Sequence, residues 1–114
     1  MSKMERNKGK RGELEVAALL NKHGFNARRG QQRRGGADSP DIIHDITNVH
    51  IEVKLRETLS SYPALEQALN DSRLSETPVL FHRRNRKPWI VIMYAEDFLL
   101  IMKELIEWRH ERDL

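Results

Sequence analysis

Apolar and polar residues alternate in two short segments near the middle of the chain, residues 41–46 and 49–54. Both are rich in Ile and Val and flank a Thr47-Asn48 turn candidate, a pattern typical of a β-hairpin. If Ile46 pairs with Val49, cross-strand partners share a face and the pleat sorts the side chains into two sets. The apolar set is Ile42, His44, Ile46, Val49, Ile51 and Val53, and the polar set is Asp41, Ile43, Asp45, His50, Glu52 and Lys54. The pattern predicts a hairpin that buries the apolar set and holds Asp41 opposite Lys54.

Two further stretches have the apolar spacing of a helix packed on one side. Over about residues 10–23, apolar residues recur at i, i+3 and i+4, and Gly24 is a natural stop. Glu13 then falls in the first turn, where the helix dipole favours a negative charge. A second helix is predicted over residues 64–74, just after Pro63.

The other predicted strands are shorter or more uniformly apolar. Residues 25–29 and 79–82 are expected to be strands. The continuous apolar run at residues 89–94 predicts a strand buried on both faces.

The last helix is predicted from about residue 95 or 97 to about residue 111. Its main apolar stripe is Phe98, Ile101, Met102, Leu105 and Trp108. Leu99, Leu100 and Ile106 make its first half apolar on almost every side. Such a helix is covered by its own chain or by a partner, and in so small a chain we expect a homodimer interface.

Composition limits the class of protein. At 114 residues we expect a flexible basic arm at residues 1–8 and a single domain at residues 9–114. The chain has no Cys, no apolar run of membrane-spanning length and no signal-peptide pattern. These features predict a cytoplasmic protein with no membrane partner.

The net charge of +3 is unevenly distributed. Residues 1–36 contain ten Lys or Arg against three Glu, and residues 83–87 form a second basic cluster. A basic half facing a polyanion is the simplest explanation, with nucleic acid the leading candidate. The candidate DNA contacts are Lys8, Lys10, Arg11, Arg28, Arg29, Arg33, Arg34, Arg83 and Arg84.

The polar set of the predicted hairpin brings together Asp41, Glu52 and Lys54. Two carboxylates about 4 Å apart repel by roughly 1 to 4 kcal/mol, so their meeting implies a raised pKa or a bound cation. Mg²⁺ prefers oxygen ligands and keeps several waters, so one or two carboxylates suffice. Without Cys, and with five His that lack ligand spacing, a zinc site is not expected. A lysine beside such an ion can orient or activate the water that attacks a phosphodiester.

Four segments together resemble a known family. They are Lys8-Gly9-x-x-x-Glu13, the helix end Leu19-Leu20-Asn21-Lys22-His23-Gly24-Phe25 with Arg28-Arg29, Pro40-Asp41, and Glu52-Val53-Lys54. The last two resemble the signature of the PD-(D/E)XK nucleases. With the upstream segments, the chain closely resembles the archaeal-type Holliday junction resolvases and their phage- or prophage-encoded relatives. The resemblance extends from about residue 8 to the last helix.

The resemblance implies an α/β fold with a restriction-endonuclease-like core, αβββαββα, around a mixed sheet. It also implies a homodimer, Mg²⁺- or Mn²⁺-dependent DNA cleavage, and a bacterial or phage-infected host cytoplasm as the location. Carried over to this chain, Asp41, Glu52 and the Val53 carbonyl would bind metal. Lys54 would assist the attacking water, and Glu13 would complete the metal site directly or through water.

We therefore expect a structure-selective endodeoxyribonuclease that cuts Holliday junctions or related branched DNA. A general or nicking endonuclease stays open, because the same core serves many nucleases. A non-catalytic nucleic-acid-binding module stays open too, although carboxylates beside phosphates give a pure binder no advantage. Gln67, on the helix after the catalytic strand, either faces solvent or reaches the scissile region as an accessory residue. His50 and His82 are expected to be buried structural residues.

Overall fold

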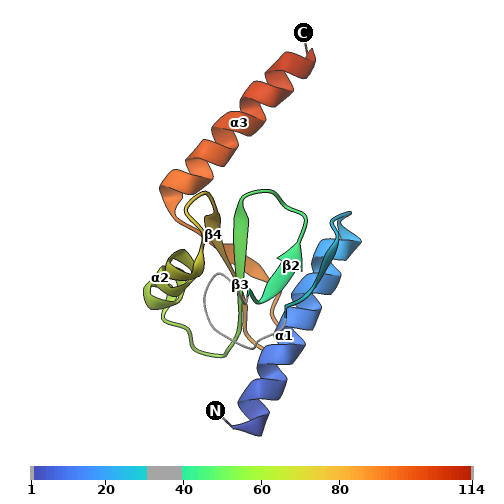
Figure 1. The fold of residues 1–114 in the computed structure, drawn as a ribbon, viewed down its shortest axis with the longest axis vertical. Coiled ribbons are helices and arrows are strands. Elements are labelled where there is room, and N and C mark those ends of the chain that lie inside the picture. Colours follow the sequence, from blue (N-terminus) through green and yellow to red (C-terminus); the bar gives the residue numbers. More distant parts are fainter. Residues whose placement is uncertain (1, 31–39, 114) are drawn as a thin grey trace.

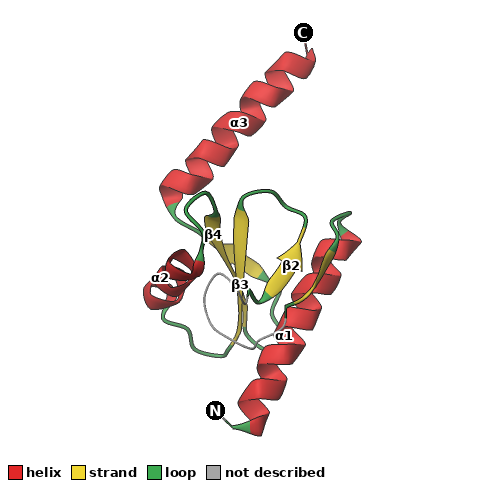
Figure 2. Ribbon diagram, in the orientation of Figure 1, coloured by secondary structure: helices red, strands yellow, loops and turns green. Residues whose placement is uncertain are grey.

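The computed structural model describes residues 2–30 and 40–113, and its elements follow the predicted order αβββαββα (Figure 1). They are α1 (Lys3–Lys22), β1 (Ala27–Arg29), β2 (Ile42–His44), β3 (Val49–Leu55), α2 (Ser61–Asp71), β4 (Thr77–Arg83), β5 (Ile90–Ile92) and α3 (Ala95–Asp113). Figure 2 shows α1 and α2 on either side of the central strands and α3 projecting away from them. The predicted fold class is confirmed.

The strands form two sheets. In the three-stranded mixed sheet, β3 pairs in parallel with β4, and β4 pairs antiparallel with β5. A second sheet contains β1 and β2 in antiparallel pairing. The predicted hairpin ladder between β2 and β3 is therefore wrong. The seven-residue strand β3 pairs along its whole length with β4, which the α2 crossover brings alongside it, whereas β2 is only three residues long.

The side-chain sorting predicted for this region is nevertheless confirmed at its centre. Ile42, Ile51 and Val53 are buried in one cluster with α1 residues Val16 and Leu20. On the other face of the sheet, Ala64 and Leu65 of α2 pack with Leu80 of β4. Strand β3 is therefore covered from both sides, which buries part of its polar set as well.

Helix α1 begins seven residues earlier than predicted. The Ser2 hydroxyl accepts a hydrogen bond of 3.2 Å from the Glu5 N–H, and the Glu5 carboxylate accepts one of 3.4 Å from the Ser2 N–H. This capping box starts the helix at Lys3, so residues 3–8 of the segment predicted to be a flexible arm are helical. Glu13 consequently lies in mid-helix, and the first-turn explanation for it is wrong. The predicted stop is confirmed, since Gly24 follows the helix with φ of 92°.

The C-terminal part is the most exposed. No residue of α3 is buried, and the molecule measures 55 × 28 × 25 Å because this helix extends from the body (Figure 1). Strand β5 lies at the sheet edge with Ile90 and Val91 about half exposed. The prediction of a strand buried on both faces is therefore wrong for the single chain. Within residues 2–30 and 40–113, no helix is long and apolar enough to cross a membrane.

Candidate active site

Asp41 lies just before β2, and its side chain is fixed to the middle of β3. Its Oδ2 atom accepts a hydrogen bond of 2.8 Å from the Val53 N–H. Its carbonyl oxygen accepts another of 2.8 Å from the Gly30 N–H. A Cβ atom at position 30 would overlap the carbonyl oxygen of Pro40. Gly30 therefore permits the close approach that holds Asp41 against β3.

The Asp41 carboxylate interacts electrostatically with both Glu52 and Lys54. The predicted pairing of β2 with β3 is not what places these residues near one another. The pKa of Asp41 is raised from 3.8 to about 7, first because burial removes its carboxylate from water and second because Glu52 carries a like charge. The Val53 N–H opposes this rise, the charge of Glu13 adds to it, and Lys54 opposes it. The ionised form of Asp41 is therefore costly in the protein alone, and a neighbouring cation would stabilise it.

Glu52 lies deep in β3 beside His50. Both side chains are buried, and His50 Nε2 lies 3.3 Å from Glu52 Oε2. Burial lowers the pKa of His50, but the hydrogen bond and the charge of Glu52 outweigh it, so that the pKa is raised overall. Because side chains alternate along a strand, His50, Glu52 and Lys54 share one face of β3. The contact with His50 thus helps to fix the orientation of the Glu52 carboxylate.

Glu13 reaches the same region from α1. Its carboxylate is 7% exposed and accepts a hydrogen bond of 2.7 Å from Arg29 Nε of β1. Gly12 lets the helix approach this closely, since a Cβ atom there would lie 3.1 Å from the Leu55 Cβ atom. Glu13 therefore lies beside the site and is already paired with Arg29.

The arrangement of the carboxylates decides which of them could hold a divalent cation. Within the described part of the chain, no group of three or more His, Cys, Asp and Glu side chains is arranged to hold a metal ion. Asp41 and Glu52 nevertheless interact electrostatically, since the pKa of Asp41 is raised first by burial and second by the charge of Glu52. Two such oxygen donors suit a hard cation that keeps most of its waters, whereas Glu13 is already bound by Arg29.

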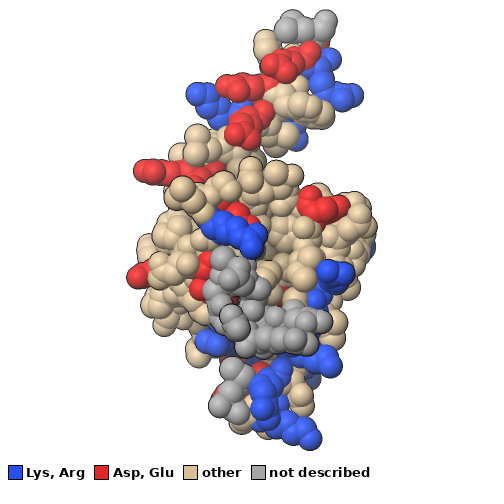
Figure 3. Space-filling model, viewed as in Figure 1, with Lys and Arg blue, Asp and Glu red and all other residues tan. Residues whose placement is uncertain are grey.

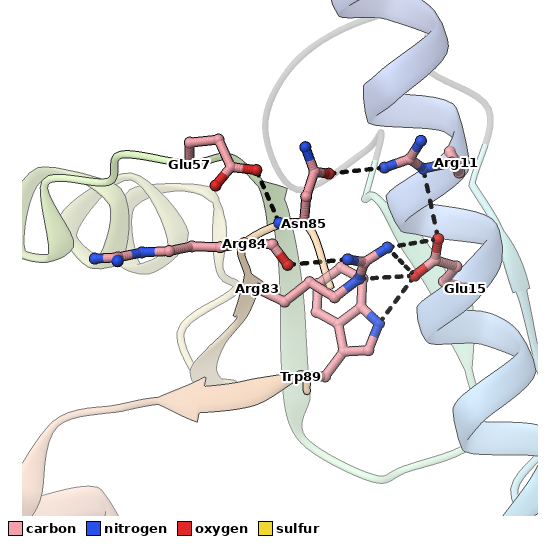
Figure 4. Close-up of polar contacts among 7 residues, drawn as sticks. All are labelled: Arg11, Glu15, Glu57, Arg83, Arg84, Asn85 and Trp89. Atoms are coloured by element: carbon pink, nitrogen blue, oxygen red, sulfur yellow. Dashed lines mark hydrogen bonds and ion pairs between the residues drawn. The ribbon is translucent and has the colours of Figure 1, made fainter. Parts of the chain in front are cut away.

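Arg83, one of the candidate DNA contacts, has a largely buried side chain that is paired with Glu15. Its guanidinium donates two hydrogen bonds of 2.9 Å to the Glu15 carboxylate of α1 (Figure 4). The guanidinium also lies over the Trp89 ring, with its Cζ atom 5.4 Å from the ring centroid. The Trp89 Nε1 donates to Glu15 as well, at 3.2 Å. Arg11 of α1 donates to the Asn85 side chain at 3.1 Å. These contacts join the turn after β4 to α1.

Figure 3 shows Lys and Arg side chains gathered on the lower part of this face of the molecule, over the N-terminal part of α1. Lys8, Lys10 and Arg11 lie along α1, and Arg28 and Arg84 are exposed at β1 and at the turn after β4. Arg29 is bound to Glu13. Arg33 and Arg34 lie outside the described residues.

A pocket of about 390 Å³ opens beside Lys54. It is lined by Lys54, Arg56, Thr58, Leu59, Ser60, Pro63, Ala64 and Gln67. Gln67 is exposed to solvent and lines this pocket, and its accessory role at the scissile region stays a prediction. Sequence reasoning did not identify this pocket, nor Glu15, Trp89, Gly12 and Gly30. The close glycine contacts and the polar network join positions distant in sequence, so no local pattern marks them.

Comparisons with known proteins agree with this geometry. A family model described as "Archaeal holliday junction resolvase (hjc)" matches residues 4–111. A search among curated proteins found no match. Among solved structures, the chain is similar to Archaeoglobus fulgidus Hjc, a Holliday junction resolvase from an archaeal hyperthermophile, with a TM-score of 0.55 and 28% sequence identity. The similarity covers 75% of this chain and 72% of that chain.

Proposed function

Because the chain belongs to the archaeal Holliday junction resolvase family, we propose that Asp41, Glu52 and Lys54 form the active site of a junction-cutting enzyme. Membership confirms the prediction of a structure-selective junction nuclease, and with it a DNA partner. The observation that carries the site assignment is the Asp41 carboxylate, held on the Val53 N–H against the like charge of Glu52.

The cofactor of this proposal is a divalent cation, Mg²⁺ or Mn²⁺, held by Asp41 and Glu52 together with the Val53 carbonyl. When bound, it supplies positive charge that stabilises the transition state at the scissile phosphate. Support comes from the raised pKa of Asp41. A cation would offset both the cost of burying the ionised carboxylate and its repulsion by Glu52. Glu13 contributes through water, since Arg29 already occupies its carboxylate.

The chain's own cations complete the proposed chemistry. Lys54 shares the β3 face of Glu52, where its ammonium group orients the attacking water and stabilises negative charge as it develops. Arg29 is placed next to the site by its bond to Glu13. A set of basic residues binds the phosphates of the DNA arms, and Arg83 supports this set from within the protein rather than touching DNA. Those proposed contacts are Lys8, Lys10, Arg11, Arg28, Arg33, Arg34 and Arg84.

A homodimer is part of the proposal. Large apolar side chains of α3 are 40–63% exposed, and the neighbouring edge strand β5 exposes Ile90 and Val91. Exposed apolar surface of this kind is typical of an interface. Two active sites related by a two-fold axis would cut two strands of a four-way junction symmetrically. A bacterial or phage-infected host cytoplasm is the proposed setting.

The test is cleavage of a labelled four-way junction beside a matched linear duplex, with Mg²⁺ and with EDTA. Wild type is compared with Glu52→Gln, which keeps a hydrogen-bond acceptor for His50, and with the matched control Glu66→Gln on the exposed side of α2. We expect paired symmetric cuts confined to the junction, lost with EDTA and in Glu52→Gln but kept in Glu66→Gln. Equal cutting of the duplex would remove the junction preference, and full activity of Glu52→Gln would remove the site assignment.

A further inference from the structure

The pocket beside Lys54 is not explained by the carboxylates or by the exposed basic residues. Its volume of about 390 Å³ lies within the range of small-ligand sites, roughly 300–1,000 Å³. It is formed by the end of β3, the connecting loop and the first two turns of α2. We propose that this pocket takes up one nucleotide of the cut strand, with its base inside, next to the scissile phosphate.

The lining matches the three chemical parts of a nucleotide. Lys54 and Arg56 supply positive charge for a phosphate. Thr58, Ser60 and Gln67 supply hydroxyl and amide groups for the sugar oxygens and the base edge. Leu59, Pro63 and Ala64 supply an apolar wall for the flat face of a base.

The charge around the pocket also favours an anion. No Asp or Glu is among the described residues that line it. The nearest acid in the loop, Glu57, accepts a hydrogen bond of 2.8 Å from the Asn85 N–H (Figure 4). Ser60 precedes α2 as its N-cap residue, yet its hydroxyl makes no cap hydrogen bond and is available at the pocket.

The position of the pocket connects it to the reaction. Lys54 belongs both to the pocket lining and to the proposed active site. It follows Glu52 by two residues, about 7 Å along a strand, so a nucleotide in the pocket would be joined to a phosphate at the carboxylates. A group bound elsewhere on the surface would have no such connection.

This occupant would also favour branched DNA. A base inside the pocket must leave its stack, and this costs least where the base is already unpaired or poorly stacked, as at a branch point. The inference rests on the proposed function, because it concerns how that same site selects its substrate.

The experiment combines a pocket variant with a scan of the DNA. Gln67→Leu removes the amide at similar size, and Asn70→Leu makes the matching change on the same helix at an exposed position outside the pocket lining. Four-way junctions carry a single abasic residue at each of the two nucleotides on either side of the cut. Cleavage rates are measured with enzyme in excess.

We expect Gln67→Leu to cut the intact junction about 3- to 10-fold more slowly than wild type, as for one lost hydrogen bond, and Asn70→Leu to match wild type. At one nucleotide, the abasic change should slow Gln67→Leu less than it slows wild type, because both changes remove the contact between Gln67 and the base. Equal abasic losses in both enzymes at every position, or an unimpaired Gln67→Leu, would overturn the pocket assignment. Absence of cutting of the intact junction by wild type would instead overturn the proposed function.

Discussion

Strand β3 and helix α3 lie at opposite extremes of burial in this molecule. Five of the seven residues of β3 are buried, whereas none of the nineteen residues of α3 is. Both are rich in large apolar side chains, so composition alone does not separate them. The difference is that β3 has partners on both sides within its own chain. The body therefore forms the proposed active site from one chain, while α3 leaves an apolar surface exposed.

The largest expected effect follows from removing apolar contacts in each region. Leu80 is fully buried in the sheet, and Leu80→Ala should lower the free energy of unfolding by about 2–5 kcal/mol. Leu99→Ala should destabilise the protein much less, and by an amount that depends on protein concentration, since only a dimer buries that residue. Chemical denaturation at several protein concentrations checks both. A concentration-independent loss for Leu99→Ala would mean that α3 packs within one chain.

A charge on α3 should separate association from folding. Leu100→Glu is expected to weaken dimerisation at least about 30-fold, as when one central interface residue is lost, while the melting curve of the body barely moves. Leu74→Glu, at a fully exposed leucine outside α3, is the control. Sedimentation velocity over a dilution series measures the effect. Unchanged association of Leu100→Glu would place the dimer interface on a different surface.

The buried carboxylate predicts a pH effect confined to the body. With its pKa raised from 3.8 to about 7, Asp41 binds its proton more tightly in the folded than in the unfolded state. The stability of the metal-free protein should therefore fall as the pH rises from about 4 to about 7. Asp41→Asn should be more stable than wild type by about 1–3 kcal/mol at pH 8, and nearly equal to it at pH 4.

Unfolding in EDTA at both pH values provides the measurement, and added Mg²⁺ should narrow the difference at pH 8 by stabilising wild type alone. If wild type were as stable as Asp41→Asn at pH 8 without metal, the ionised Asp41 carboxylate would not carry the cost that its raised pKa implies.

The smallest effect concerns two adjacent arginines. Arg84→Gln should reduce the slope of log binding constant against log salt by about one unit, as expected for one lost phosphate contact. Arg83→Gln should lower stability instead, because it removes the two hydrogen bonds that the guanidinium donates to Glu15. Junction binding over a salt series, with thermal melts of both variants, separates the roles. If Arg83→Gln lost a full unit of slope and melted like wild type, Arg83 would be a DNA contact and not a structural residue.

The sequence was informative where local pattern decides the structure. The order of elements and the stop at Gly24 followed from apolar spacing and turn residues. The start of α1 was also encoded locally, in the Ser2-x-x-Glu5 capping box, but the apolar period fades before it and misled the prediction.

Strand partners were not encoded in this way. The Ile- and Val-rich segments around Asn48 suggested a hairpin, yet β3 pairs with β4, whose first residue, Thr77, lies far along the chain. Asp41 still reaches β3, through one side-chain hydrogen bond to Val53 instead of a ladder. The alternation of side chains survives this change because it depends on the strand itself and not on its neighbour.

The link between Glu15 and Arg83 has a consequence for the shape of the DNA. It joins α1 to the turn after β4, so the positive charges on these two elements keep a fixed spacing. A surface that does not adjust requires the DNA to bend to it. Duplex DNA resists bending over lengths of about 150 base pairs, whereas the arms of a branched molecule pivot at their common point. If these charges contact DNA as proposed, their fixed spacing would favour the more flexible nucleic acid.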